Sequence, residues 1–242
     1  MRKLYSYIIT ADNGISPCYD DNIYTLACCK PQIRRMIYSL YKDEINSDNS
    51  DIWVMGVRRD RENNNRPFIV YLANITKVIK LEDYYNNSGI YASRKDCKYR
   101  GVKTVEDLPI SMDSEDIRFK EYFPDIKALD DNEHSKFDNS EELYKLSKTK
   151  RKNVMKDICG RAVLLSSKFI HFSQVSKYDK YALTEMLKPC FSELLKEYAL
   201  KNQRHNHSFD NWKEFDKDIK KINFVSNGKI KPLDEKNCVC CI

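Results

Sequence analysis

The chain has 242 residues, of which 41% are hydrophobic and 32% are charged. This balance predicts a folded, soluble protein with room for one large domain, or for one domain with an appended part. The net charge of +6 permits binding to nucleic acid or to a nucleotide without requiring it. Aromatic residues make up 12% of the chain and include 16 tyrosines, which supply flat rings for packing or for stacking on bases.

Several common classes are disfavoured at this level. Residues 4–10 are too short and too polar for an export signal, and no apolar run approaches the length of a membrane span. We therefore expect a cytoplasmic protein without a membrane partner, in which the 9 cysteines are reduced. With only 6 glycines, the chain shows neither a Walker-type lysine loop nor a GxGxxG fingerprint, and no cofactor is expected.

The strand signals are short and irregularly spaced. Residues 4–10 carry apolar side chains on both faces, which predicts a central strand, and residues 58–66 resemble a charged hairpin connection. Because β-branched residues are frequent in them, three later segments also favour strands, the last as a strand pair or one bent strand. These segments are residues 52–57, 68–75 and 162–172.

Helical spacing follows Pro31 and recurs in the last third of the chain. The later helices are expected at residues 141–157, at residues 181–200, where Pro189 should break or kink the helix, and after Trp212. Irregular loops rather than long helices separate the strands, which argues against a doubly wound parallel sheet. The prediction is an α+β fold: an antiparallel sheet or a small mixed β-barrel, decorated by helices, in residues 1–175, with a helical C-terminal portion, residues 176–242, packed on it.

The segment at residues 24–35 is the first candidate site. Pro31 suits the first position of a helix, and Lys30, Arg34 and Arg35 lie at or near that helix start. A helix N-terminus attracts anions, so three added cations predict a site for a phosphate or an acid. The alternative is a core helix whose basic residues face solvent.

Further residues could contact a base or a nucleotide. Aromatic rings stack on bases, guanidinium groups bind phosphate, and a carboxylate can accept from a base amino group. The candidates are Trp53, Tyr99 and Phe172 for stacking, Arg94 with Arg34 and Arg35 for phosphate, and Asp96 for the amino group. Each aromatic residue could equally be part of the core.

The adjacent cysteines, Cys28 and Cys29, suggest a second kind of chemistry. A neighbouring lysine and a helix N-terminus both lower a thiol pKa, and His171 or His205 could act as the base for a cysteine nucleophile. Buried structural cysteines are the alternative. No metal is expected, because adjacent cysteines are poor ligands for one ion and no CxxC pair is present.

The loop at residues 93–99 brings Asp96 and Tyr99 three positions apart. Asp96 could form a salt bridge with Arg34 or Arg35, read an amino group of a ligand, or lie solvated at the surface. The basic residues around Arg151 allow a third function, contact with an acidic protein partner.

Five segments of the chain resemble a known family, the nucleotide modification associated domain family of the second type. Its most specific block is Leu-Ala-Cys-Cys-Lys-Pro-x-Ile-Arg-Arg at residues 26–35, and a weaker sixth match lies at residues 203–205. The five segments are residues 7–14, 24–35, 51–56 together with 68–85, 93–99, and 160–172.

This resemblance implies a role in systems that modify bases or nucleotides in DNA, often in phage–host conflict. Residues 51–85 also look like the corresponding part of PUA-like domains such as EVE and ASCH, small barrels that hold a modified base. The expected fold is therefore a PUA-like barrel, and the expected partner is a nucleotide or a modified base in DNA, with protein partners of a modification system possible. The matched block adds Thr25 to the candidate ligand contacts. The alternative is a modifying enzyme that uses a cysteine nucleophile.

Overall fold

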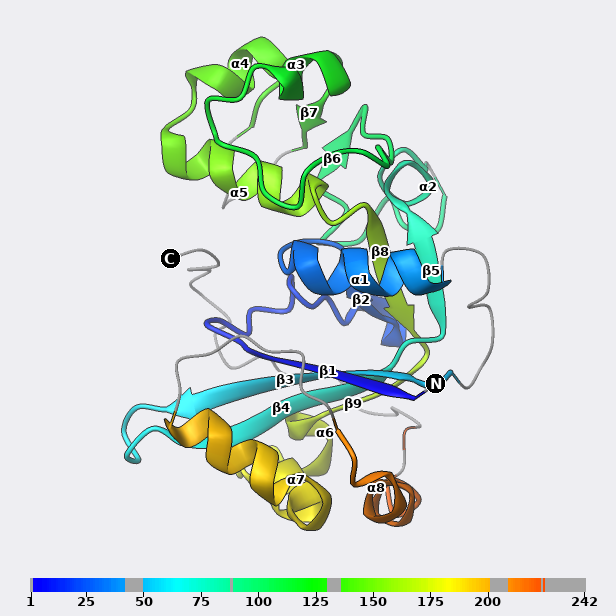
Figure 1. The fold of residues 1–242 in the computed structure, drawn as a ribbon, viewed down its shortest axis with the longest axis vertical. Helices are drawn as coiled ribbons and strands as arrows, with labels where there is room; N and C mark the ends of the chain where they lie inside the picture. Colours follow the sequence, from blue (N-terminus) through cyan, green and yellow to red (C-terminus); the bar gives the residue numbers. More distant parts are fainter. Residues whose placement is uncertain are drawn as a thin grey trace.

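The computed structural model describes residues 2–41, 50–87, 89–129, 136–200, 209–222 and 224. Its strands form three sheets (Figure 1). The four-stranded sheet runs in the order β1 (Lys3–Ile8), β3 (Ile52–Asp60), β4 (Arg66–Asn74) and β9 (Lys168–His171). The three-stranded sheet runs in the order β2 (Tyr24–Leu26), β8 (Ala162–Ser166) and β5 (Lys77–Lys80). The third sheet pairs β6 (Tyr99–Arg100) with β7 (Lys127–Ala128).

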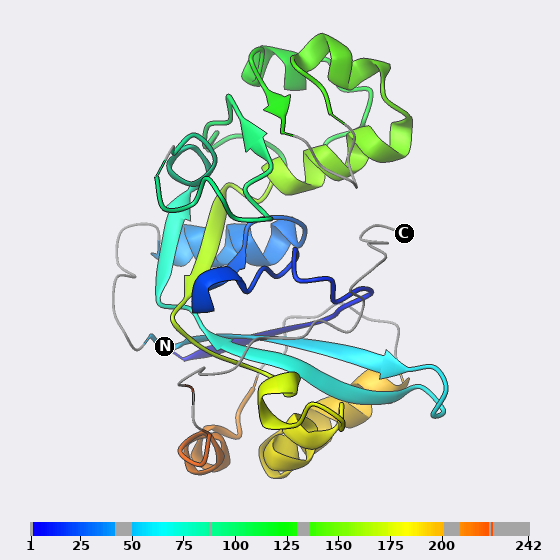
Figure 2. The ribbon, with the colours of Figure 1, turned by 180° about the vertical axis from the view of Figure 1, so that it is seen from behind.

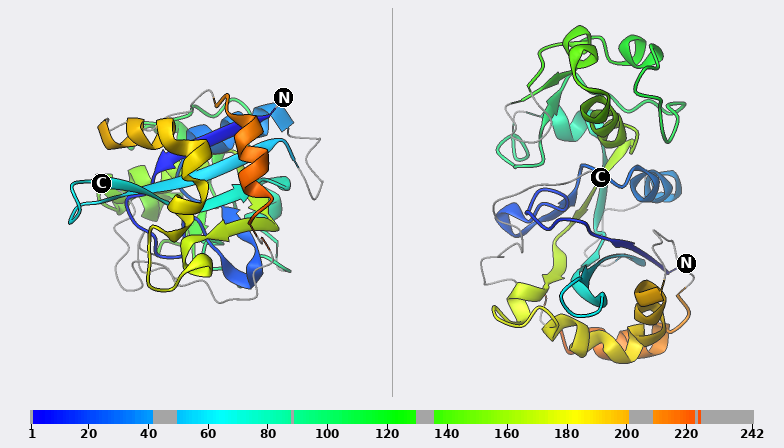
Figure 3. Two further views of the ribbon diagram at one scale, coloured as in Figure 1. Left: turned by 90° about the horizontal axis from the view of Figure 1, so that it is seen from below. Right: turned by 90° about the vertical axis from the view of Figure 1, so that its left-hand side faces the viewer.

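The helices lie on both sides of these sheets. In Figures 1 and 3, one set of helices lies below the four-stranded sheet, another helix lies beside the three-stranded sheet, and the remaining helices lie towards the far end of the molecule. The lower three are α6 (Phe172–Val175), α7 (Ala182–Leu200) and α8 (Trp212–Ile219), and the one beside the sheet is α1 (Pro31–Tyr41). The distant group comprises α2 (Leu81–Tyr85), α3 (Arg118–Tyr122), α4 (Ser140–Lys145) and α5 (Lys148–Ile158). A single 3-10 turn covers Asp20–Asn22.

Two bent stretches of chain connect the two larger sheets. β4 continues into β5, and β8 continues into β9, with only residues 75–76 and 167 between them. Thr76 holds the bend from both sides: its backbone N–H donates to Leu165 O at 2.9 Å, and its hydroxyl accepts from Ser167 N at 3.2 Å. Figure 2 shows β5 and β8 side by side as they leave the four-stranded sheet.

The buried apolar residues form two clusters. The larger cluster lies around the four-stranded sheet and includes Trp53 and residues of α1, α7 and α8. The smaller cluster lies around α2, α5 and the 97–128 segment, and includes Tyr85 and Phe123. The segment between β1 and β2 lies between the two larger sheets (Figure 3).

The mixture of helices and largely antiparallel strands matches the predicted class, but the described residues form no closed barrel. The reason is that the bent strands lead into a separate sheet instead of closing the first one. β1 is an edge strand paired in parallel with β3, not a central strand. The predicted hairpin connection at residues 58–66 is present but shorter, since β3 extends to Asp60, β4 begins at Arg66, and residues 61–65 form the turn between them.

The helical predictions hold with changes of detail. α1 and α8 form where expected, the helix predicted over residues 141–157 is two helices, α4 and α5, and α7 continues through Pro189. Helix α7 packs on β4 and α8 packs on α7, so these helices cover one face of the four-stranded sheet. The proposed division of the chain at residue 175 stays a prediction.

Arg34 joins three elements of the fold. Its side chain is fully buried, and its guanidinium donates to Cys29 O at 2.8 Å and to Ala162 O at 2.9 Å. It also donates to Lys156 O at 3.3 Å and to Asp157 O, which are terminal carbonyl groups of α5. A cation at a helix C-terminus is favoured by the dipole and satisfies carbonyl groups that have no partner within the helix.

Gly160 makes room for this guanidinium. A Cβ atom at position 160 would overlap the Cζ and both terminal nitrogens of Arg34. Those atoms cannot move away freely, because backbone carbonyls on three elements hold them.

We predict that Gly160→Ala destabilises the fold by about 2 kcal/mol, since a methyl group must displace the Arg34 guanidinium from its acceptors. Urea unfolding would measure the difference. Gly89→Ala is the matched control, because the new Cβ would meet only the flexible side chain of exposed Asn87 and should change stability by less than about 0.5 kcal/mol. Equal stability of Gly160→Ala and the wild type would contradict this role.

Candidate functional site

The first group of predicted residues forms a buried polar network. The Asp96 carboxylate is fully buried and accepts from Thr25 Oγ1 at 2.5 Å and from Tyr84 OH at 2.5 Å. The Arg94 guanidinium lies 3.6 Å from Asp96 Oδ1 and donates to Thr25 Oγ1 at 3.0 Å. It also donates to the backbone carbonyls of Asp20 and Ile23.

This network fixes a loop. The predicted partner of Asp96 was Arg34 or Arg35, but the ion pair forms with Arg94, which lies two residues away. Burial raises the pKa of Asp96, although Arg94, Thr25 and Tyr84 act in the opposite direction. Because Thr25, Arg94 and Asp96 contact one another in the interior, we interpret them as structural residues that hold the 93–96 loop against β2.

Tyr99 belongs to a neighbouring contact. Its hydroxyl donates to Asp157 Oδ2 at 2.8 Å, and Asp157 Oδ1 accepts from the backbone N–H of Cys29 at 2.7 Å. Asp157 therefore connects β6 to the start of α1. The Tyr99 ring, predicted as a stacking surface, is fully buried and meets the Tyr85 ring edge to face, so it is part of the core around α2 and α5.

The two cysteines differ in environment. Cys28 is 2% exposed, and burial raises the pKa of its thiol well above the ordinary value, with Asp157 acting in the same direction. A thiol of this kind is a poor nucleophile at neutral pH. Cys29 is partly exposed and adopts a left-handed backbone conformation with φ of 58°. His205, one of the two proposed bases, lies outside the described residues.

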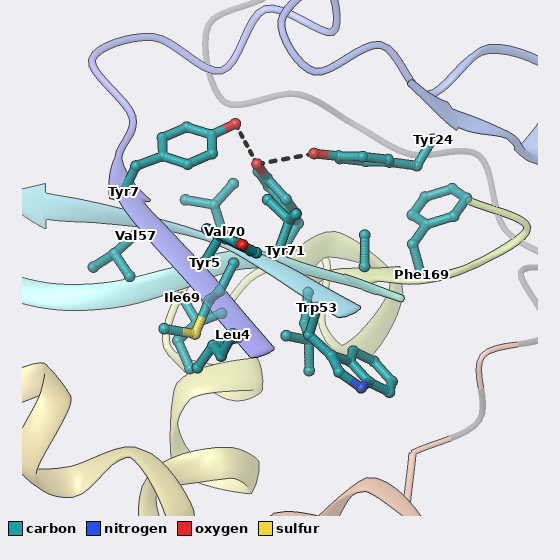
Figure 4. Packing of buried hydrophobic residues seen from close by; sticks show 14 of the residues in the cluster. Leu4, Tyr5, Tyr7, Tyr24, Trp53, Val57, Ile69, Val70, Tyr71 and Phe169 are labelled. Atoms are coloured by element: carbon teal, nitrogen blue, oxygen red, sulfur yellow. Dashed lines mark hydrogen bonds between the residues drawn. The ribbon is translucent and has the colours of Figure 1, made fainter. Parts of the chain in front are cut away.

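Three more predicted contacts lie elsewhere. Trp53 is on the face of the four-stranded sheet that α8 covers, with its ring centroid 5.0 Å from that of Phe215, so it is a core residue (Figure 4). The guanidinium of Arg34 is occupied by carbonyl groups, so a phosphate contact is wrong for this residue. Arg151, predicted to face an acidic partner, is buried and donates to Ser114 O at 3.0 Å and to Tyr144 O at 2.9 Å.

A different group of residues converges between the two larger sheets. We call it the tyrosine–histidine site. Tyr71 OH donates to Tyr7 OH and accepts from Tyr24 OH at 3.2 Å, so hydroxyls from β4, β1 and β2 meet at one point (Figure 4). All its side chains are at least nine-tenths buried. Its members are Tyr7, Asp12, Tyr19, Tyr24, Tyr71, His171 and Ser173.

His171 is at the centre of the polar part of this site. Its Nδ1 accepts from the backbone N–H of Ser173 at 3.2 Å and lies 2.7 Å from Ser173 Oγ. Since Nδ1 is an acceptor, Nε2 carries the hydrogen and donates to Asp12 Oδ2 at 3.0 Å. His171 also caps α6, and the local pairing with Ser173 and Gln174 sets the orientation of the ring.

Tyr19 covers this pair with an aromatic ring. Its centroid lies 5.1 Å from that of His171, in an edge-to-face arrangement, and 5.9 Å from that of Phe169, stacked. The Tyr19 hydroxyl is buried and has no hydrogen-bond partner among the residues that the structure describes. Burial and the neighbouring Asp12 charge raise its pKa well above the ordinary value.

Lys30 lies at the edge of the site. Its ammonium group is 4.7 Å from the centre of the Tyr7 ring and donates to Ile8 O at 3.3 Å. Lys30 and Cys29 are partly exposed, and both have left-handed backbone angles, with φ of 43° and 58°. This conformation is strained for residues with a Cβ, and such strain gathers at functional sites. Phe172, another predicted contact, is adjacent, with its ring centroid 4.5 Å from that of His171.

The sequence indicated part of this site and missed the rest. Lys30, His171 and Phe172 were among the candidates, whereas the four tyrosines, Asp12 and Ser173 were not. Tyr7 alternates with Ile8 on a predicted strand, and Asp12 begins a turn, but both features are also typical of a core strand and its loop. Only the assembled sheet, in the order β1, β3, β4 and β9, brings Tyr7, Tyr71 and His171 together.

Three further properties concern the described residues as a whole: metal-binding groups, membrane-spanning helices and the state of the cysteines. Across the described ranges, no three His, Cys, Asp or Glu side chains come close enough together to hold a metal ion. Among those same residues, no helix has the length and apolar character needed to span a bilayer. The six cysteines that the structure describes carry free thiols.

The fold and the site define a mixed α/β protein with a buried cluster of tyrosine, histidine and carboxylate groups between two sheets. The model of one family, nucleotide modification associated domain 2, matches residues 1–231. The chain therefore belongs to this family, as its sequence motifs predicted, and the family name places it among proteins associated with nucleotide modification. Comparisons with curated proteins and with solved structures found no significant match.

We predict that Asp96→Asn destabilises the protein by about 3 kcal/mol, because it leaves the Arg94 charge buried without its counter-ion. Thermal or urea unfolding would measure this. Asp216→Asn makes the same chemical change in a surface ion pair with Arg2, and should change stability by less than about 1 kcal/mol. Equal effects of the two substitutions would mean that Asp96 is no more than a surface carboxylate.

We predict that Cys28 reacts with iodoacetamide at pH 7.5 at least about tenfold more slowly than a simple thiol, because a raised pKa lowers the thiolate fraction. Mass spectrometry of timed samples would give the rate for each cysteine. The same protein in denaturant is the control, since every thiol should then react at the ordinary rate. Reaction of folded Cys28 faster than a simple thiol would restore the nucleophile hypothesis.

Proposed function

We propose that this chain binds a modified base or a nucleotide at the tyrosine–histidine site, as part of a nucleotide modification system. The family supports the general setting.

One observation carries the proposal: the Tyr19 hydroxyl is buried without a hydrogen-bond partner, beside Asp12 and next to the His171 ring. Leaving a buried hydroxyl unpaired costs about 1–3 kcal/mol, and a native protein rarely keeps such a group without a use for it. A ligand with polar atoms at the edge of a ring would give this hydroxyl its partner.

The other members of the site suit the same ligand. Tyrosine faces stack on bases, and the Asp12 carboxylate, which His171 Nε2–H holds in place through Oδ2, can accept from an exocyclic amino group. Lys30 is positioned at the partly exposed edge, where the phosphate of a nucleotide would remain in contact with water. Entry from this edge requires the covering segment, residues 9–23, to move.

We favour binding over cysteine-based modification for a physical reason. Cys28 has the raised thiol pKa of a buried residue. Neither ring nitrogen of His171 is directed to a cysteine, because they face Ser173 and Asp12.

We predict that Tyr19→Phe weakens binding of the ligand about tenfold while leaving the stability of the free protein unchanged or increased. Removing a hydroxyl that has no partner in the free protein costs nothing there, but removes a hydrogen bond in the complex. Isothermal titration calorimetry with plain and modified nucleoside monophosphates would measure binding, and thermal unfolding would measure stability.

Tyr198→Phe is the matched control. The Tyr198 hydroxyl lies on α7 and donates to Ser6 Oγ at 2.8 Å, so the substitution removes a hydrogen bond from the folded protein. It should lower stability by about 1 kcal/mol and leave affinity unchanged. The proposal fails if no nucleotide of the panel binds, or if the wild type and Tyr19→Phe bind equally.

A further inference from the structure

A second pair of cations lies away from the tyrosine–histidine site and shares no residue with it. Arg35, on α1, and Arg161, just after α5, are 126 positions apart in the sequence, and both lie near Glu106. Arg161 Nη1 is 3.7 Å from Glu106 Oε2, and Tyr38 OH donates to Glu106 Oε1 at 2.8 Å. Burial and the adjacent Arg161 charge lower the pKa of Arg35, with Glu106 acting in the opposite direction.

Within the described part of the chain, each guanidinium has a buried N–H group without a hydrogen-bond partner. These groups are Nη1 of Arg35 and Nε of Arg161. The Arg161 side chain is 11% exposed, and its Nη2 donates only weakly, to Leu108 O at 3.3 Å. Two like charges with unused donors destabilise the folded state unless an anion comes between them.

The backbone holds Arg161 in this place at a cost. Its φ of 63° is left-handed, a conformation that glycine adopts most easily. The glycine of this turn is instead the preceding residue, Gly160, because a side chain there would collide with the Arg34 guanidinium. The Arg161 N–H donates to Ile158 O at 3.2 Å, and its carbonyl accepts from Thr104 Oγ1 at 3.0 Å. Both sides of the residue are therefore anchored, so its guanidinium is presented from a rigid position.

We propose that Arg35 and Arg161 together bind a phosphate group. A phosphate presents several acceptor oxygens, and guanidinium groups bind them with paired, charge-assisted hydrogen bonds. The single carboxylate of Glu106 neutralises one of the two positive charges and leaves one for the ligand. Its side chain is 59% exposed, so it can turn towards solvent when the phosphate binds.

The phosphate could come from a free nucleotide or from the backbone of a nucleic acid. Two kinds of probe separate these sources, each measured at fixed ionic strength. Small phosphates, namely inorganic phosphate and pyrophosphate, represent the free ligand, and a short DNA duplex represents the nucleic-acid backbone. For a duplex, the affinity should also fall with added salt, and the slope should be smaller in a variant that has lost a contact.

The experiment compares Arg35→Gln, Arg161→Gln and Glu106→Gln with the wild type by calorimetry. Each arginine substitution should weaken binding about tenfold, whereas Glu106→Gln should strengthen it, since a competing carboxylate is removed. Arg118→Gln is the control for net charge, because Arg118 is exposed and pairs with Asp116 on the surface. Phosphate should also raise the melting temperature of the wild type more than an equal ionic strength of chloride does.

The proposal is wrong if neither kind of probe binds the wild type. It is also wrong if Arg35→Gln weakens binding, relative to the wild type, by no more than Arg118→Gln does. It is also wrong if Glu106→Gln weakens binding. Should Arg161→Gln fail to fold, Arg35→Gln and Glu106→Gln still decide the question, since these positions lie on the partly exposed side of the pair. Tyr19→Phe should leave phosphate affinity unchanged, so this result and that of the proposed base site are independent.

Discussion

The rest of the structure depends on the buried guanidinium of Arg34. It connects the end of α5, the beginning of β8 and the segment that leads into α1 through hydrogen bonds to backbone carbonyls. A buried charge costs free energy unless its donors are satisfied, and here the helix C-terminus of α5 supplies both partial negative charge and acceptors. Gly160 leaves the space that the guanidinium needs. The next residue, Arg161, has a left-handed backbone conformation that is strained for a residue with a side chain.

The same contact sets the position of the candidate site. Arg34 Nε donates to the backbone carbonyl of Cys29, and Asp157 Oδ1 accepts from the Cys29 backbone N–H, so both backbone groups of Cys29 are fixed. The following residue, Lys30, is thereby directed over the Tyr7 ring at the edge of the tyrosine–histidine site. Structural and proposed functional residues of the basic block at residues 30–35 are therefore adjacent: Arg34 stabilises the fold, Lys30 borders the proposed base site, and Arg35 belongs to the proposed phosphate site.

The sequence predicted the fold class and several elements because those depend on local pattern. β4 is rich in β-branched and apolar residues, and α1 has apolar residues at helical spacing after Pro31. The roles of Arg34 and Asp96 could not be read in this way. The burial of Arg34 depends on carbonyl groups at the end of α5, more than 120 residues away in the sequence. Asp96 forms its ion pair with the nearby Arg94 instead of with a distant arginine. Trp53 was a reasonable stacking candidate, but only the packing of α8 shows which face of the sheet it occupies.

The central claim is that a base binds among the four tyrosines. The most direct measurement is an NMR titration of protein labelled with ¹³C in the tyrosine rings, using the nucleotide that binds best in calorimetry. The account predicts that the signals of the four site tyrosines, Tyr7, Tyr19, Tyr24 and Tyr71, shift together as ligand is added. The signals of Tyr84, which is bonded to Asp96, and of Tyr99, which is bonded to Asp157, should not shift. Saturable binding that shifts Tyr84 or Tyr99 and leaves the four unchanged would contradict it.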